Sequence, residues 1–205
     1  LNMKLKQKVK LLITCDSGAA AGKTTAAKYL SKKFSLNLLT SGLLYRYVAY
    51  KLLHSKKIPT NTEFLKKIIN KINSKLLNNK KLYSPKVTAY TAEIAKIKKI
   101  RKMLNKYQKK FATKRLAILE GRDMGILFPN ADIKFFFKCS LKVAAKRRFK
   151  ELKKSNKEVT YKAVELAIKL RNQADSTRKI SPLRIPNGAV IVDTTNMNKK
   201  QMFRR

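Results

Sequence analysis

The sequence has few of the residues on which several kinds of protein site depend. Its two cysteines, Cys15 and Cys139, are far apart and belong to no CxxC pair or histidine cluster. We therefore expect buried core thiols in a reducing cytoplasm rather than a disulfide or metal site. The single histidine, His54, lies in a lysine-rich segment with no partner nearby in sequence. It is expected at the surface, so histidine-based catalysis is not predicted.

Long apolar runs are also absent. No run approaches the roughly 18–20 residues that a membrane-spanning helix needs. The basic N-terminal segment is followed only by LLITC before Asp16, too short for the apolar part of a signal peptide. We expect no membrane partner and a cytoplasmic protein. A length of 205 residues with 44% hydrophobic content predicts one globular domain that can bury a substantial core.

Acidic residues are scarce. The chain has 11 Asp and Glu against 50 Lys and Arg, a formal net charge of +39 that could indicate a nucleic-acid-binding protein. The lysines are spread over the whole chain, however, and are not interleaved with aromatic residues as in a binding platform. We expect a solvated surface with at most non-specific nucleic-acid binding at low salt.

Short apolar runs alternate with helical patterns along the chain. Strands are predicted at residues 9–15, 36–39, 116–119, 133–137 and 189–192. The periodicity predicts helices at residues 23–34, 43–53, 61–73 and 158–172, another from about Ser140, and a long pattern at 87–111, possibly in two pieces; residues 74–86 are expected to be a loop or a reduced subdomain. This alternation predicts an α/β fold, a five-stranded parallel sheet covered by helices on both faces. The polar motifs would gather at the carboxyl ends of its strands.

The segment after the first strand has the layout of a phosphate-binding loop. A turn of small residues leads to Gly22-Lys23-Thr24 and then to a helix. Backbone N–H groups converge on an anion in such a turn, and the helix dipole favours negative charge there. Lys23 would reach the phosphates and Thr24 would bind Mg²⁺. Glycine is scarce here too, because Ser17 stands where the pattern asks for the first glycine. The alternative is an ordinary strand-to-helix turn with an incidental lysine.

A second anion would need further positive groups facing this loop. Arginine is more selective than lysine in a chain where lysine far outnumbers it, because only its planar fork makes bidentate phosphate contacts. The candidates lie at predicted strand ends and in one arginine-rich segment: Arg46 beside Tyr45, Arg101, Arg122, Arg171 and Arg178.

Four motifs in order resemble those of bacterial cytidylate kinases, over nearly the whole chain. They are the loop from Asp16 to Thr25, SGLLYR at 41–46, GRDMG with FPNAD at 121–132, and RNQADSTRKISPL at 171–183. The resemblance implies a three-layer P-loop NTPase fold and ATP-dependent, Mg²⁺-assisted phosphorylation of CMP and dCMP by a monomer. It implies a core at about 9–56, 112–150 and 180–205, a reduced monophosphate-binding insert at about 57–111 and a lid at about 151–179, all within a single domain of residues 1–205.

The resemblance also implies roles for particular residues. ATP would be bound by Ser17, Gly18, Ala19, Ala20, Ala21, Gly22, Lys23, Thr24 and Thr25, with Thr24 on the metal. The monophosphate would be bound by Ser41, Tyr45, Arg46, Arg101, Arg122, Asp123, Arg171, Asp175 and Arg178. Lys23, Arg122, Arg171 and Arg178 would be catalytic. Asp123, with Arg101 and Arg178 near it, would face the base, because an acidic acceptor suits the N4 amino group of cytosine.

The chain departs from the family pattern at several positions, which are Ser17, Thr40, Tyr83, Ala92, Asn172 and Ala174. Three alternatives therefore stay open. The chain could be another small-substrate kinase with a phosphate loop, a basic RNA-binding protein without kinase activity, or a decaying enzyme with weak activity. Measuring phosphoryl transfer to a panel of monophosphates would distinguish another small-substrate kinase from a cytidylate kinase. An RNA-binding protein would instead bind RNA with a steep salt dependence and show no phosphoryl transfer.

Overall fold

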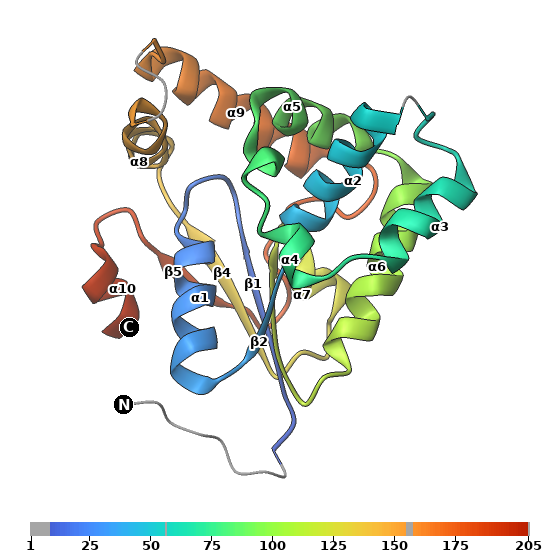
Figure 1. The fold of residues 1–205 in the computed structure, drawn as a ribbon. Coiled ribbons are helices and arrows are strands. Elements are labelled where there is room, and N and C mark those ends of the chain that lie inside the picture. Colours follow the sequence, from blue (N-terminus) through green and yellow to red (C-terminus); the bar gives the residue numbers. More distant parts are fainter. Residues whose placement is uncertain (1–8, 56, 155–157, 205) are drawn as a thin grey trace. The chain divides into compact units, whose positions relative to one another are not determined.

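Five strands form one parallel sheet, as predicted. They are β1 (Leu11–Ser17), β2 (Asn37–Thr40), β3 (Leu116–Gly121), β4 (Ile133–Lys138) and β5 (Val190–Asp193). In this computed structural model, which describes residues 9–55, 57–154 and 158–204, the strand order is β2-β3-β1-β4-β5 (Figure 1). The register pairs Cys15 of β1 with Glu120 of β3 and with Phe135 of β4. The central position of β1 brings the segment after it beside the segments that follow β3 and β4.

The chain divides into two compact units. A core unit comprises residues 1–38 and 115–205, and an inserted unit comprises residues 39–114. In the core unit, α1 (Lys23–Phe34) packs its buried Ala26 and Ala27 against Ile13, Cys15 and other apolar side chains of the sheet. A C-terminal helix that was not predicted, α10 (Lys199–Arg204), lies beside α1, where Phe203 stacks on Tyr29 with ring centroids 4.0 Å apart (Figure 1).

Three further helices belong to the core unit. A short one, α7 (Met124–Leu127), follows β3; α8 (Leu141–Lys153) begins after its N-cap Ser140, as predicted. Helix α9 (Tyr161–Thr177) packs on α8 through a small apolar cluster. The prediction for α9 was wrong at both ends, since Thr160 caps the helix and its last turn includes the segment that we expected to follow it. The consequence is that Asp175 lies on the same helix as Asn172, rather than after its end.

The inserted unit is helical. It contains α2 (Ser41–Ser55), α3 (Thr62–Asn70), α4 (Ser74–Leu77), the 3₁₀ turn η1 (Lys80–Tyr83), α5 (Pro85–Ile94) and α6 (Lys98–Ala112). Asn61 caps α3, because its side chain accepts a hydrogen bond from the Phe64 N–H group, and the helix ends at Asn70, before the predicted Asn73. The long pattern over residues 87–111 forms two helices. Residues 74–86, expected as a loop or a reduced subdomain, contain two short helical turns and the start of α5. Asn73 and Asn79 each cap the turn that follows.

The rare residues are placed as follows. Cys15 is fully buried, as predicted, and both cysteines are free thiols. Cys139 was expected in the core but is only partly buried, because it directly follows the last residue of β4 and lines a cavity. His54 is exposed on α2, as predicted. Within the described residues, no helix combines the length and the apolar character needed to cross a membrane.

Candidate active site

The predicted phosphate-binding loop connects β1 to α1. Gly22 precedes the helix with a φ angle of 92°, and among the described residues no side chain caps its first N–H groups. The first turn of α1 also carries no acidic residue. Free N–H groups and an unopposed helix dipole at this point favour an anion.

The backbone of the loop is strained at Ala20 and not at Ser17. Ser17 is the last residue of β1, fully buried, and its hydroxyl donates to the Gly18 carbonyl oxygen at 2.7 Å. Ala20 has a φ angle of 54° in the left-handed region. A side chain in this region costs roughly 1–2 kcal/mol relative to glycine. The loop therefore lacks a glycine where its backbone conformation favours one, and this destabilises it at Ala20 rather than at Ser17.

We expect Ala20→Gly to stabilise the protein by about 1 kcal/mol, because glycine adopts this conformation without steric cost. Urea unfolding monitored by circular dichroism measures the change. Ala21→Gly is the matched control, since Ala21 has no positive φ angle, and it should destabilise the protein. Equal effects of the two substitutions would contradict the assignment of strain to Ala20.

Lys23 and Thr24 meet at a carboxylate that the predicted site did not include. Glu120, near the end of β3, is 2% exposed. The Thr24 hydroxyl donates to Glu120 Oε2 at 3.1 Å, and Lys23 Nζ lies 3.7 Å from the same oxygen. Burial lowers the pKa of Lys23, and Glu120 opposes that shift. Phosphate groups bound here would also favour the charged amine. The sequence signal for Glu120 is an acidic residue at the end of a wholly buried strand.

A second buried carboxylate, Asp16, joins β1 to the segment after β3. Its two oxygens accept hydrogen bonds from the N–H groups of Met124 at 2.8 Å and Gly125 at 2.6 Å. Gly125 is required at this close approach, because a Cβ atom there would lie 2.5 Å from Pro186. Burial raises the pKa of Asp16 to about 7, although the two hydrogen bonds oppose the shift. Asp16 thereby fixes the backbone immediately after Arg122 and Asp123.

The raised pKa of Asp16 predicts a pH-dependent stability. The folded state binds the proton of Asp16 more tightly than the unfolded state, so the stabilisation is complete below about pH 4 and is lost as the pH rises through about 7. Asp16→Asn removes this titration. We expect the variant to gain about 2–3 kcal/mol relative to wild type between pH 5 and pH 8. Urea unfolding at both values measures the gain.

Asp132→Asn is the control for this prediction. Asp132 is exposed, and its carboxylate also accepts a backbone N–H, from Leu12 at 2.7 Å. The control shows how much of any change comes from removing one negative charge. A free-energy difference between Asp16→Asn and wild type that stays constant with pH would contradict the buried titration.

Arg122 and Asp123 lie directly after β3 and pair with α9. Arg122 Nη1 is 3.1 Å from Asp175 Oδ2, and Arg178 lies 3.1 Å from Asp175 and 3.6 Å from Asp123. Arg171 Nε is 3.9 Å from Asp175 Oδ2, the oxygen that Arg122 also approaches. Burial lowers the pKa of Arg122 to about 10, with Asp175 opposing the shift. Three arginines thus surround one carboxylate, and the cluster remains rich in positive charge.

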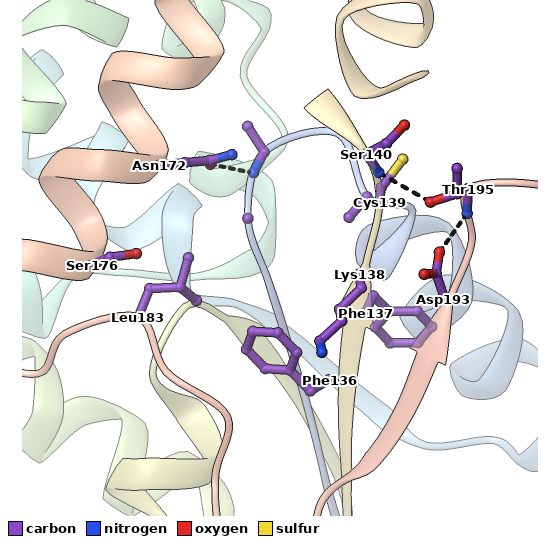
Figure 2. A pocket seen from close by; sticks show the side chains of 13 residues that line it. Phe136, Phe137, Lys138, Cys139, Ser140, Asn172, Ser176, Leu183, Asp193 and Thr195 are labelled. Carbon is purple, nitrogen blue, oxygen red and sulfur yellow. Dashed lines mark hydrogen bonds between the residues drawn. The ribbon is translucent and has the colours of Figure 1, made fainter. Parts of the chain in front are cut away.

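Asn172, on the same helix, contacts the phosphate loop directly. Its Oδ1 accepts a hydrogen bond from the Ala19 N–H group at 2.9 Å, as Figure 2 shows. Asn172 also lies so close to Gly18 that a Cβ atom there would be 3.0 Å from Oδ1. Arg122 Nη1 is 3.5 Å from that oxygen. The amide oxygen thus occupies an N–H group of the loop that an anion would otherwise use.

A cavity of about 440 Å³ opens beside the loop (Figure 2). It is bounded by Gly18 and Ala19, by the carboxyl ends of β4 and β5, and by α9. Ser140 N–H donates to the Thr195 hydroxyl at 3.0 Å, and Thr195 N–H donates to Asp193 at 2.8 Å. The hydrogen bonds from Thr195 lower the pKa of Asp193. One wall of the cavity carries these polar groups, and other parts of it are lined by Phe136, Phe137 and Leu183. This combination suits a ligand with an apolar ring and polar edges.

The inserted unit holds the other predicted substrate-binding residues. The buried Ser41 hydroxyl accepts a hydrogen bond from Gln108 at 2.7 Å. Arg101 is 2% exposed, donates to the Ala95 carbonyl oxygen at 3.2 Å, and lies over the Tyr45 ring at 5.7 Å. Arg46 donates to the Leu82 carbonyl oxygen and to the Thr88 hydroxyl, at 2.9 and 2.8 Å. Packing within this unit therefore holds both arginines in place.

Comparison with known proteins identifies the family. A sequence model described as "Cytidylate kinase" matches residues 13–205. The chain belongs to the cytidylate kinase family. A cytidylate kinase of Clostridium tetani (strain Massachusetts / E88) is 33% identical over 205 residues, 95% of this chain and 91% of the relative. One of Pseudothermotoga lettingae is 34% identical over 197 residues, 91% and 88% of the two chains.

One solved structure supports the fold alone. An uncharacterised protein from Eubacterium ventriosum ATCC 27560 matches with a TM-score of 0.57 at 12% sequence identity, covering 95% of this chain and 94% of that one. At this identity the likeness extends to the architecture and not to the chemistry of the site.

Within this cytidylate kinase fold, the predicted residues fall into two groups. The loop from Ser17 to Thr25 and the cluster of Arg122, Asp123, Arg171, Asp175 and Arg178 lie together in the core unit. Ser41, Tyr45, Arg46 and Arg101 lie in the inserted unit. Arg178 is close to Asp123, as expected, whereas the approach of Arg101 to Asp123 stays a prediction. The role of each residue also stays a prediction.

Three contacting residues were absent from the predicted site of this family member. Glu120 had a signal in the sequence, and Asn172 was noted only as a departure from the family pattern. Gln108 had no signal, because its partner Ser41 is far away along the chain. Asn172 and Ala19 are separated by 153 positions, and Gln108 and Ser41 by 67.

Proposed function

We propose that the chain transfers the γ-phosphoryl group of ATP to CMP and dCMP, forming CDP and dCDP. The observation that carries the proposal is the segment Glu120–Asp123. Its first residue contacts Lys23 and Thr24 of the phosphate loop, and its last two pair with the arginine-rich end of α9. A donor-phosphate site and a charged acceptor site are thereby built on the end of one strand.

The chemistry asks little covalent work of the protein. The acceptor phosphate is already an anionic nucleophile, so no general base is needed. The loop N–H groups would hold the ATP phosphates. Lys23 would stabilise the negative charge that develops on the phosphoryl group during its transfer. Arg122, Arg171 and Arg178 would neutralise the acceptor phosphate and align it. In the structure these arginines share Asp175, which a phosphate would have to displace in part.

The residues at the loop fit a magnesium ion that arrives with the nucleotide. Thr24 and Glu120 offer hard oxygen ligands, and in the described part of the chain no three acidic, histidine or cysteine side chains form a metal site of their own. This suits Mg²⁺, which usually keeps several waters and binds through substrate phosphates. The ion would supply charge neutralisation at the phosphates. Thr24 and Glu120 would hold it, directly or through water.

The preference for cytosine would rest on Asp123. A carboxylate accepts a hydrogen bond from the cytosine N4 amino group, whereas uracil presents a carbonyl oxygen at that position. Arg178 Nη2, 3.6 Å from Asp123 Oδ2, orients the carboxylate. The cavity beside the loop would take the nucleoside part of ATP. Helix α9, which already touches the loop through Asn172, would act within a lid at about residues 151–179, of which 155–157 lie outside the described residues.

Further expectations about the insert, the oligomeric state, the localisation and RNA binding accompany this proposal. The insert at about residues 57–111 would bind the monophosphate, and the protein would work as a cytoplasmic monomer. The net charge of +39 would lead at most to non-specific RNA binding that weakens steeply with salt.

ADP release measured with CMP, dCMP, UMP, AMP and dTMP tests the proposal. We expect release with CMP and dCMP well above that with the others. Preference for UMP or AMP would contradict it and favour another small-substrate kinase. Release with none, together with tight and salt-steep RNA binding, would favour the RNA-binding alternative.

A further inference from the structure

An exposed aromatic ring lies against one of the candidate phosphate-binding arginines. Tyr83, the last residue of η1, is 60% exposed, whereas the preceding Leu82 is fully buried. Asn79 caps η1 by accepting from the Lys81 N–H group at 2.9 Å, and Ser84 caps α5 directly after it. The backbone of Tyr83 is thus fixed between two capped turns. Burial of Leu82 directs the neighbouring tyrosine ring to the surface.

The guanidinium group of Arg46 lies over this ring. Its central carbon is 5.2 Å from the ring centroid of Tyr83. Its Nη1 donates to the carbonyl oxygen of Leu82 and to the Thr88 hydroxyl. A cation over an aromatic face is attracted to the ring electrons, and arginine stacks on such faces more readily than lysine. The segment from Leu82 to Thr88 therefore holds Arg46 through three contacts, and these contacts leave its charge intact.

We propose that Tyr83 is a positioning residue for the acceptor nucleotide, acting by holding Arg46 in the orientation that binds the phosphate of the monophosphate. This rests on the proposed function. A long arginine side chain loses rotamer freedom when it binds an anion, and a site that is ordered beforehand avoids that cost. The ring orders the guanidinium without competing with phosphate, as a carboxylate partner would.

The requirement for an aromatic face gives a sharp test. We expect Tyr83→Leu to raise the KM for CMP about 3- to 10-fold, with kcat and the KM for ATP changed less than twofold. Tyr83→Phe keeps the ring and should remain close to wild type. Lys86→Ala, an exposed change at the start of α5, is the control for altered charge and surface nearby. In an Arg46→Ala background, Tyr83→Leu should have no further effect on the KM for CMP.

A binding readout that does not need turnover comes from Tyr83→Trp. The natural chain has no tryptophan, so this residue would be the only one. A tryptophan ring binds a cation at least as well as tyrosine, so the KM for CMP should be retained. We expect the tryptophan emission to change on titration with CMP, with a midpoint near the KM for CMP, and to stay constant with ATP alone.

The failure of this proposal can be told apart from failure of the proposed function. If wild type releases ADP with a different monophosphate, that acceptor replaces CMP and the same KM comparison is made. An unchanged KM for the acceptor in Tyr83→Leu would overturn the positioning role. The same would follow if KM rose equally in Tyr83→Phe, if KM for ATP rose as much, or if emission of Tyr83→Trp did not respond to the acceptor.

Discussion

Replacing Lys23 with alanine should lower kcat by about a thousandfold or more while leaving the affinity for CMP largely intact. Lys23 begins α1 at the phosphate loop, and its amine lies 3.7 Å from Glu120 in a largely buried position. A fixed charge in such a place stabilises the charge that develops on a transferring phosphoryl group far more than it would in water. Steady-state ADP release measures kcat, and calorimetric titration measures CMP binding.

The control for this loss is Lys28→Ala on the same helix. Lys28 is exposed, so its removal changes the net charge equally and should leave kcat within about twofold of wild type. Removing Lys23 also leaves Glu120 without its cationic partner, so thermal unfolding has to show that Lys23→Ala is folded. A folded Lys23→Ala enzyme with more than about a tenth of wild-type kcat would contradict the assigned role.

Replacing Asp123 with alanine should reduce the preference for CMP over UMP by about 10- to 100-fold. The carboxylate is 6% exposed and pairs with Arg178. Loss of a specific hydrogen bond to a base edge is worth about 1–3 kcal/mol of discrimination. Since Arg178 keeps its contact with Asp175, the cluster should survive the substitution. The measurement is the ratio of kcat/KM for CMP to that for UMP.

Glu151→Ala provides the comparison for Asp123→Ala. Glu151 is an exposed acid paired with Arg148 at 2.9 Å, so its removal alters charge without altering the site. The ratio should stay at the wild-type value in this control. If Asp123→Ala lowered kcat/KM equally for CMP and UMP, Asp123 would have a structural role and another group would select the base.

Much of the fold could be predicted from the sequence because its signals are local. The buried strand β3 begins with the apolar run Leu116–Leu119, and α1 begins at the lysine of a recognisable loop. Polar motifs after the strands were expected at one edge of the sheet, and the register of β1 with β3 and β4 confirms this. The prediction was wrong at the ends of α9, where local signals were weak. The two short turns in residues 74–83 were not predicted individually, because side-chain caps rather than periodicity determine them.

The sequence by itself determined the parallel sheet, the phosphate loop and the family, because strand runs, turns and ordered motifs are properties of neighbouring residues. The tertiary structure alone decided that the loop is strained at Ala20, that Asn172 occupies an N–H group of that loop, and that Arg46 lies over the ring of Tyr83. It also placed Glu120 between Lys23 and Thr24. These features depend on backbone angles and on contacts between distant residues, which exist only once the strands have paired and the helices have packed.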